Sequence, residues 1–218
     1  MFELARAVNF LHTGDSHGWK AFHRDIKSAN ICLAEDFTAR LTGFGVSECV
    51  PDETSNIIPK FVPDETSKVI PGSILLSTEG DIFGTPGYMC PEYSREMLMW
   101  SECPFIPAYD VFSIGIVMAE LILGRLNQNV YQTYVKKDEH TMVTDGLEQL
   151  QKDADKKVDW QNQDALQLVC RTAIGCITPD SNTRLGTEVI MANLEMACQL
   201  IAASQPRNRT ITSDGQVT

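Results

Sequence analysis

The stretch HRDIKSAN, from His23 to Asn30, sets a carboxylate, an ammonium group and a carboxamide within one short polar segment. The residues Trp19–Phe22 before it have the composition of a short β-strand. Two further short strands are expected after it, at Ile31–Leu33 and Ala39–Leu41, with the polar turn Glu35-Asp36 between them. The sequence therefore predicts that a loop between short strands carries these three polar groups.

Beyond these strands the chain is predicted to be mainly helical. Apolar residues recur at helical spacing in three segments, residues 2–12, 166–177 and 187–201. Residues 107–123 are apolar on nearly every face, which predicts a helix through the middle of the domain. Residues 129–137 predict a short amphipathic helix, and the charged residues 138–160 predict a surface loop. In the last of the three segments four residues are expected to face the core: Ile190, Leu194, Ala197 and Ile201.

Four further motifs follow the opening stretch in order. They are GFG at 43–45, GTPGYMCPE at 84–92, YDVFSIGIVMAEL at 109–121 and SNTRLG at 181–186. Together with HRDIKSAN they resemble, over roughly residues 2–202, the C-terminal lobe of the eukaryotic protein kinase domain. HRDIKSAN followed by TARLTGFG is closest in wording to the Pelle and receptor-associated branch of the tyrosine-kinase-like Ser/Thr kinases.

The resemblance implies a mainly α fold of the α+β type. It is the helical C-lobe of the kinase fold, with a few short β-strands around a catalytic loop at residues 23–30. The activation segment would cover residues 43–92, and the central helix residues 107–123. Residues 203–218 are polar and are expected to form a disordered tail.

The resemblance also implies a role for the polar groups of the catalytic loop. Phosphoryl transfer depends on positioning and charge neutralisation more than on covalent chemistry. Asp25 would orient the substrate hydroxyl and accept its proton, and Lys27 would neutralise charge on the phosphate transferred from ATP. Asn30 would hold one magnesium ion.

Five further residues would act structurally if the resemblance holds. His23 would pack, and Arg24 would present a cation to a phosphorylated activation segment. Asp110 would accept hydrogen bonds from the backbone of the catalytic loop. Glu92 and Arg184 would pair and lock the end of the activation segment.

The sequence departs from the family pattern in two places. Gly43 stands where the family has the aspartate that chelates the magnesium between the β- and γ-phosphates. A hard cation needs carboxylate oxygens and glycine offers none, so binding of magnesium and ATP is expected to be weakened. The glycine-rich loop, the strand lysine and the helix glutamate of a kinase N-lobe have no match, so the N-lobe is expected to be absent from this chain.

Residues 46–83 are rich in Pro, Asp, Glu, Ser and Thr and contain a tandem repeat. VPDETSNIIP at 50–59 recurs as VPDETSKVIP at 62–71. Two short copies are too few for a solenoid, so we interpret them as a duplicated insertion in the activation segment. The many hydroxyl groups leave a second interpretation open, a loop that is ordered by phosphorylation.

Composition excludes several classes of partner. The net charge of −11 argues against a nucleic-acid-binding face, and no apolar stretch is long enough to span a bilayer. The seven cysteines form no CxxC pair, and no secretory signal is visible. These features are typical of a cytoplasmic protein with reduced, mostly buried thiols.

The sequence leaves three functions open within the Ser/Thr kinase family. The first is an active kinase that transfers phosphate from ATP to protein hydroxyls. The second, which Gly43 favours, is a catalytically impaired, pseudokinase-like or truncated lobe that acts in signalling as a binding module. The third is a non-functional or partial product, such as the C-lobe fragment of an active kinase whose N-lobe is missing from this chain. In each case the expected partners or substrates are proteins.

Overall fold

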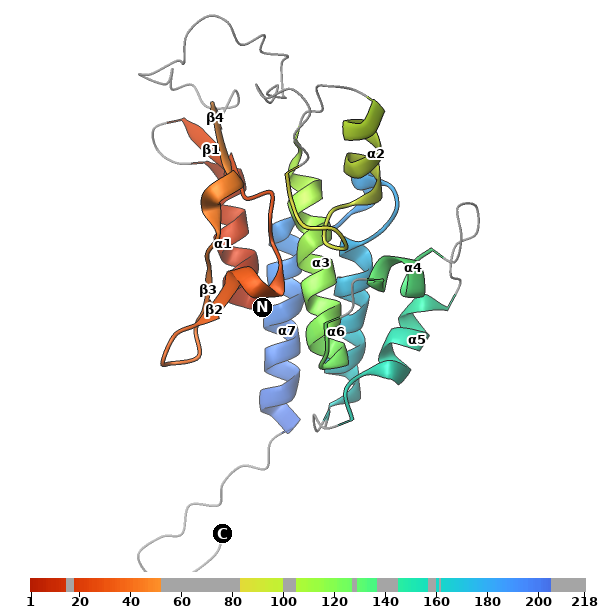
Figure 1. Ribbon diagram of the computed structural model, residues 1–218. Coiled ribbons are helices and arrows are strands. Elements are labelled where there is room, and N and C mark those ends of the chain that lie inside the picture. The colour runs from red at the N-terminus through yellow and green to blue at the C-terminus, as the bar shows by residue number, and fades with distance from the viewer. Residues whose placement is uncertain are drawn as a thin grey trace, which may run out of the picture.

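The computed structural model describes residues 1–14, 18–51, 83–99, 105–126, 129–136, 145–156, 160 and 162–204. This part of the chain is mostly helical, with two small sheets on one side of the helices (Figure 1). It confirms the predicted fold class, mainly α with a few short strands around the catalytic loop. Within the described ranges, no helix has both the length and the apolarity that crossing a bilayer requires.

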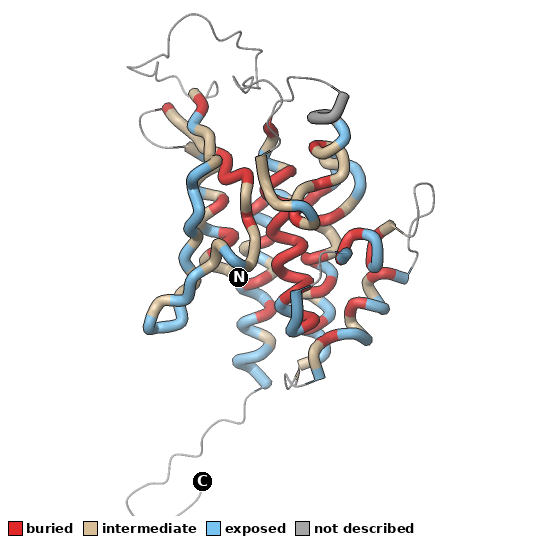
Figure 2. Tube along the Cα trace, viewed as in Figure 1, coloured by how far each residue is buried: buried red, intermediate tan, exposed pale blue. Residues whose placement is uncertain are grey.

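Helix α3, Pro107–Leu123, runs through the middle of the molecule and has the bounds that the sequence predicts. A proline in the first turn costs no hydrogen bond, because that N–H has no partner within a helix. Nearly every side chain of α3 is buried, as the red course in Figure 2 shows. Burying one large aliphatic side chain stabilises a fold by about 1.5–3 kcal/mol, so α3 is the centre of the core.

Three further long helices form the bundle with α3. They are α1 (Phe2–Thr13), α6 (Gln163–Cys176) and α7 (Thr187–Ser204). Helix α6 packs on both α3 and α7, and α1 packs mainly on α7. Gly115 permits the close approach of α3 and α6, because a Cβ at that position would lie 2.6 Å from Ile177 Cγ2. The side chain of Asn162 caps α6 by accepting a hydrogen bond from the Ala165 N–H at 2.9 Å.

The strands form two antiparallel pairs on either side of the catalytic loop. Strand β1 (Trp19–Phe22) pairs with β4 (Glu48–Pro51), and Phe22 lies opposite Glu48. Strand β2 (Ile31–Leu33) pairs with β3 (Ala39–Leu41). Because β1 ends where the loop begins and β2 starts where it ends, the two sheets fix both ends of the loop.

The remaining elements are short. The 3₁₀ turns η1, η2 and η3 span Ser28–Asn30, Phe44–Val46 and Ser181–Thr183. Helix α2 spans Pro91–Met99, α4 spans Val130–Tyr134 and α5 spans Gly146–Asp153.

The structure corrects four expectations. Helix α5 lies within residues 138–160, which were expected to form a loop; it is too short for a clear pattern, and its packing on α6 stabilises it. Strand β4 lies within the expected insertion 46–83, because it pairs with a distant strand that local sequence does not reveal. Helix α7 continues to Ser204, past the expected boundary at residue 202, and Ile201 on its last turns is 42% exposed instead of buried. Of the six described cysteines, which are all free, only three are buried: Cys90, Cys170 and Cys176.

Two expectations fall outside the described residues. The repeat copies lie at 50–59 and 62–71, of which the structure describes only residues 50 and 51. Residues 205–218 of the expected disordered tail also lie outside.

Candidate functional site

Asp110, at the start of α3, holds the catalytic loop by its backbone. Its carboxylate accepts hydrogen bonds from the main-chain N–H groups of His23 and Arg24, each at 2.9 Å. A third contact joins the carboxylate to His12 Nε2 on α1, also at 2.9 Å. Asp110 is only 1% exposed, so these three contacts compensate for burying its charge. The sequence did not indicate a role for His12, because it lies 98 positions before Asp110 and no motif contains both residues.

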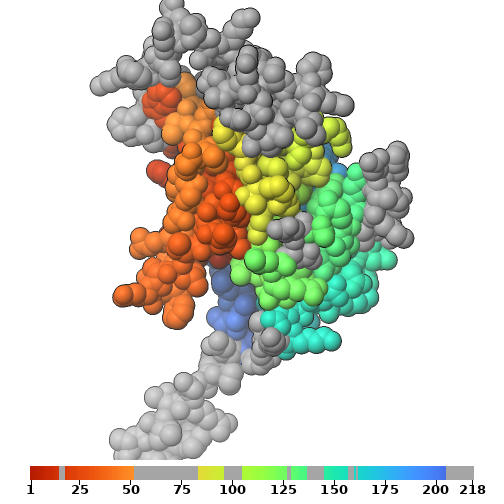
Figure 3. Space-filling view, viewed as in Figure 1, coloured from red at the N-terminus to blue at the C-terminus, as the bar shows by residue number. Residues whose placement is uncertain are grey.

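The side chains expected to carry the chemistry lie together around Asp25. Lys27 Nζ lies 2.8 Å from Asp25 Oδ2, and Thr85 Oγ1 donates to Asp25 Oδ1 at 2.6 Å. Lys27 Nζ also donates to Thr85 Oγ1 at 2.7 Å, which closes a triangle of three groups. In Figure 3 residues 83–99 (yellow) lie against the segment before residue 51 (red to orange). The resemblance had not singled out Thr85, although its motif contained it.

The triangle determines how readily Asp25 is protonated. Burial raises the pKa of this carboxyl, but the hydrogen bonds from Lys27 and Thr85 and the charge of Lys27 outweigh burial and hold the pKa below its usual range. Asp25 is therefore a carboxylate at neutral pH. It has the charge state that a proton acceptor requires, and its acceptor oxygens are occupied by groups of the protein itself.

His23 packs within the loop and is fully buried. Its Nε2 lies 2.9 Å from the carbonyl oxygen of Thr42, and its Nδ1 accepts the Asp25 N–H at 3.3 Å. The ring of Phe44 meets the imidazole edge-on, with 4.7 Å between ring centroids. Both ring nitrogens are therefore engaged within the protein.

Gly43 leaves the region near Asn30 without the carboxylate that the family pattern places there to bind magnesium. The Asn30 side-chain nitrogen donates to Asp25 Oδ2 at 3.0 Å and to the Asp25 carbonyl oxygen at 2.8 Å. Gly43 has a left-handed backbone (φ 82°), and a Cβ built on it would lie 2.5 Å from Asn30 Cγ. The Asn30 carboxamide therefore fills the space that a side chain at residue 43 would need. Among the residues that the structure describes, no three His, Cys, Asp or Glu side chains gather where they could hold a metal.

Arg24 is buried and has a positive φ of 68°. Its Nη1 donates to Glu48 Oε2 at 2.6 Å, and its guanidinium carbon lies 4.4 Å from the centre of the Phe83 ring. Burial raises the pKa of Glu48 above its usual value, although the charge of Arg24 acts in the opposite direction. Sequence reasoning missed Glu48, because β4 itself was not predicted.

Arg184 forms an ion pair with Glu92 at the start of α2. Its Nε donates to the Thr178 carbonyl oxygen and its Nη1 to the Ala108 carbonyl oxygen, each at 3.0 Å. The guanidinium also lies 5.0 Å from the centre of the Phe112 ring. Arg184 thus joins the activation segment, α3 and the turn after α6.

A second buried carboxylate, Glu120 on α3, is 3% exposed and was not predicted to matter. The Tyr88 hydroxyl donates to its two oxygens at 2.9 and 3.0 Å, and the Ser28 hydroxyl donates to it as well. Burial, followed by the hydrogen bond to Glu120, raises the pKa of Tyr88 to about 12. The carboxylate therefore links the catalytic loop to Tyr88, near the end of the activation segment.

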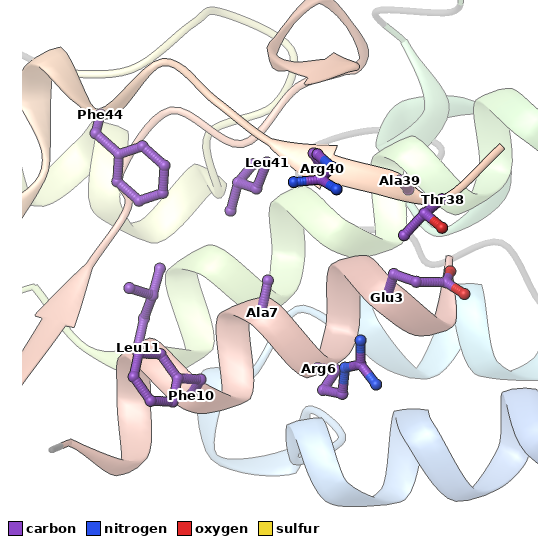
Figure 4. A pocket seen from close by; sticks show the side chains of 10 residues that line it. All are labelled: Glu3, Arg6, Ala7, Phe10, Leu11, Thr38, Ala39, Arg40, Leu41 and Phe44. Atoms are coloured by element: carbon purple, nitrogen blue, oxygen red, sulfur yellow. The ribbon is translucent and has the colours of Figure 1, made fainter. Parts of the chain in front are cut away.

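A groove of about 780 Å³ lies between α1 and the β2–β3 pair (Figure 4). Its walls are mainly apolar, and Phe10 (65% exposed) and Phe44 (49% exposed) lie at one end. Two arginines line it, Arg6 and Arg40, against one acid, Glu3. Neither arginine forms an ion pair with a described residue.

Comparisons with known proteins agree with this geometry. The family model described as "Protein kinase domain" matches residues 1–194. Among curated proteins of Arabidopsis thaliana, the LRR receptor-like serine/threonine-protein kinase IOS1 is 32% identical over 206 residues, covering 89% of this chain and 20% of that protein. The receptor-like protein kinase HERK 1 is 27% identical over 219 residues, covering 98% of this chain and 23% of that protein. The chain thus spans about a fifth of the length of the relatives it matches.

Proposed function

Because this chain belongs to the protein kinase domain family, we propose that it is a kinase-derived lobe that acts in signalling as a protein-binding module. Its catalytic loop keeps the family's side chains, but we infer that it does not transfer phosphate from Mg-ATP efficiently. The observation that carries this proposal is the arrangement of Gly43 and Asn30, where a carboxamide occupies the space of the missing carboxylate.

The physical argument concerns the charge that phosphoryl transfer develops. Kinases neutralise this charge mainly with metal ions bound by a carboxylate and an asparagine. Here Gly43 supplies no carboxylate, and only Asn30 remains of these two ligands. Loss of a charge-stabilising metal removes several kcal/mol of transition-state stabilisation, which is a rate loss of roughly a thousandfold or more.

The binding function is supported by the groove between α1 and the β2–β3 pair. Exposed apolar surface of this kind marks sites where proteins associate. Arg6 and Arg40, which form no ion pair with a described residue, make the groove locally basic in a chain of net charge −11. The partner that fits is therefore a protein segment with apolar side chains on one face and Asp or Glu beside them.

A second candidate is the C-lobe of an active Ser/Thr protein kinase. The triangle of Asp25, Lys27 and Thr85 favours it, because the acceptor carboxylate is ionised and a cation lies beside it. In that case Asp25 would accept the proton of a substrate hydroxyl, and Lys27 would lie next to the transferred phosphate.

Phosphotransfer from radiolabelled ATP to a basic protein substrate separates the two candidates. The chain should be assayed alone and also fused to the residues encoded upstream of it, where these residues include a glycine-rich loop and a strand lysine. We expect no incorporation above that of the Asp25→Asn control in either form. Magnesium-dependent incorporation that the Asp25→Asn control lacks would establish the active kinase instead.

The docking proposal has its own test, a pair of synthetic amphipathic helical peptides that share a leucine face and carry either Glu or Lys on the other face. We expect the Glu peptide to bind more tightly in fluorescence anisotropy, with a difference that shrinks at high salt. The double variant Arg6→Glu/Arg40→Glu should reverse the preference. Equal binding of both peptides would contradict the assignment of an acidic partner.

A further inference from the structure

Arg24 lies between the two ends of the segment 52–82, which the structure does not describe. Before that segment, Glu48 on β4 pairs with the guanidinium, and after it Phe83 stacks on the guanidinium. The Arg24 side chain is only 4% exposed and that of Glu48 is 20% exposed. A single cation thus contacts the strand that precedes the segment and the first residue that follows it.

The contacts of this cation are incomplete. A guanidinium is a planar fork that two oxygens of a carboxylate or a phosphate can bind together. Arg24 uses Nη1 for Glu48 Oε2, and among the described residues its buried Nε has no hydrogen-bond partner. The site is therefore an anion position that one carboxylate fills in part.

Glu48 is placed at this position by the backbone. Strand β4 pairs with β1 so that Glu48 lies opposite Phe22, two residues before Arg24. The neighbouring Ser47 hydroxyl donates to the His23 carbonyl oxygen at 3.1 Å, which fixes the entry to β4 on the catalytic loop. The carboxylate reaches Arg24 from a hydrogen-bonded strand.

We propose that Glu48 is a built-in anion that holds β4 and the start of the activation segment against Arg24, so that no added phosphate group is needed there. While Glu48 is in place, its negative charge repels a second anion, and the site is closed to inorganic phosphate and to phosphorylated side chains. The ordering of this region is then a fixed property of the sequence, whichever function the lobe performs.

The test removes the charge of Glu48 and keeps its shape. Thermal unfolding of the wild type, Glu48→Gln and the control Glu195→Gln is measured in phosphate and in chloride of equal ionic strength. The control removes a carboxylate from an exposed position on α7. We expect phosphate to leave the melting temperatures of wild type and control unchanged, and to raise that of Glu48→Gln by roughly 3–6 °C at ten times the dissociation constant.

Two results would overturn the proposal: a response of the wild type equal to that of Glu48→Gln, or no response of Glu48→Gln. A measurement on the wild type alone covers the case in which the variant does not fold. Hydrogen exchange of the amides in Trp19–Phe22 and Glu48–Pro51 should be the same in phosphate and chloride. Increased protection of these two strands by phosphate would show that the site of Arg24 is open, and would refute the built-in anion.

Discussion

Replacing the buried Arg184 by alanine should strongly destabilise the lobe. The substitution leaves the Glu92 carboxylate without its ion-pair partner. It also leaves the Thr178 and Ala108 carbonyl oxygens without their hydrogen-bond donor. Breaking a buried ion pair by deleting one partner costs about 3–5 kcal/mol of unfolding free energy. We count the two lost hydrogen bonds, at about 1 kcal/mol each, within this range. Because the Glu92 side chain is 19% exposed and retains some hydration, we expect a total of about 4 kcal/mol.

Urea unfolding followed by circular dichroism measures this loss, with Arg171→Ala on the exposed face of α6 as the matched control. The control should stay within about 0.5 kcal/mol of wild type. Glu92→Ala and the double variant complete a cycle, in which the double variant should lose less than the sum of the singles by about 0.5–3 kcal/mol. A loss below 1 kcal/mol for Arg184→Ala, or strict additivity, would refute the reasoning that this pair locks the activation segment.

Three further predictions follow from contacts described above. Gly43→Ala should destabilise the lobe by about 1–3 kcal/mol, because the new Cβ at a positive φ meets the Asn30 side chain; thermal unfolding should show a smaller cost in an Asn30→Ala background, and an equal cost there would rule out the collision. His12→Ala should raise hydrogen exchange in Trp19–Phe22 and the catalytic loop more than in α6, because Asp110 loses a partner; an unchanged pattern would mean that His12 does not position the loop. Stability as a function of pH should separate two carboxylates with opposite shifts. The wild type should be more stable than Asp25→Asn above pH 3.8, and this difference in unfolding free energy should decline as pH falls through the depressed pKa of Asp25. The stability of Glu48→Gln relative to wild type should increase as pH rises from 4.5 through the raised pKa of Glu48. Parallel stability curves for wild type and variants would contradict both assignments.

Local sequence was sufficient for elements that carry a complete pattern within themselves. The bounds of α3 and of β1, β2 and β3 agree with prediction, because apolar runs and short strand-like stretches are local signals. Strand β4 was missed because a four-residue strand with Glu, Cys and Pro gains its stability from its partner. Helix α5 was missed for the same reason, since its fully buried Leu150 contacts a core that the sequence alone does not display.

The candidate site divides in a similar way. Motif resemblance selected Asp25, Lys27, Asn30 and Gly43, and the structure brings all four to one place. It did not select His12, Glu48, Thr85 or Glu120, whose importance depends on what lies next to them in space. The finding that Asn30 occupies the space beside Gly43 is likewise a steric fact that no motif contains.

The position of Arg24 between Glu48 and Phe83 has a consequence for how this chain could change over evolutionary time. Strand β4 and Phe83 are both held in place by described contacts to Arg24, so the distance that segment 52–82 must span is set by the fold and not by the length of the segment. The entropy of loop closure varies only with the logarithm of the number of residues, so removing one twelve-residue copy of the repeat from these 31 residues would change the folding free energy by about 0.4 kcal/mol. Copies of the repeat could therefore be gained or lost by replication slippage almost neutrally, and natural variation in their number should be tolerated by the fold.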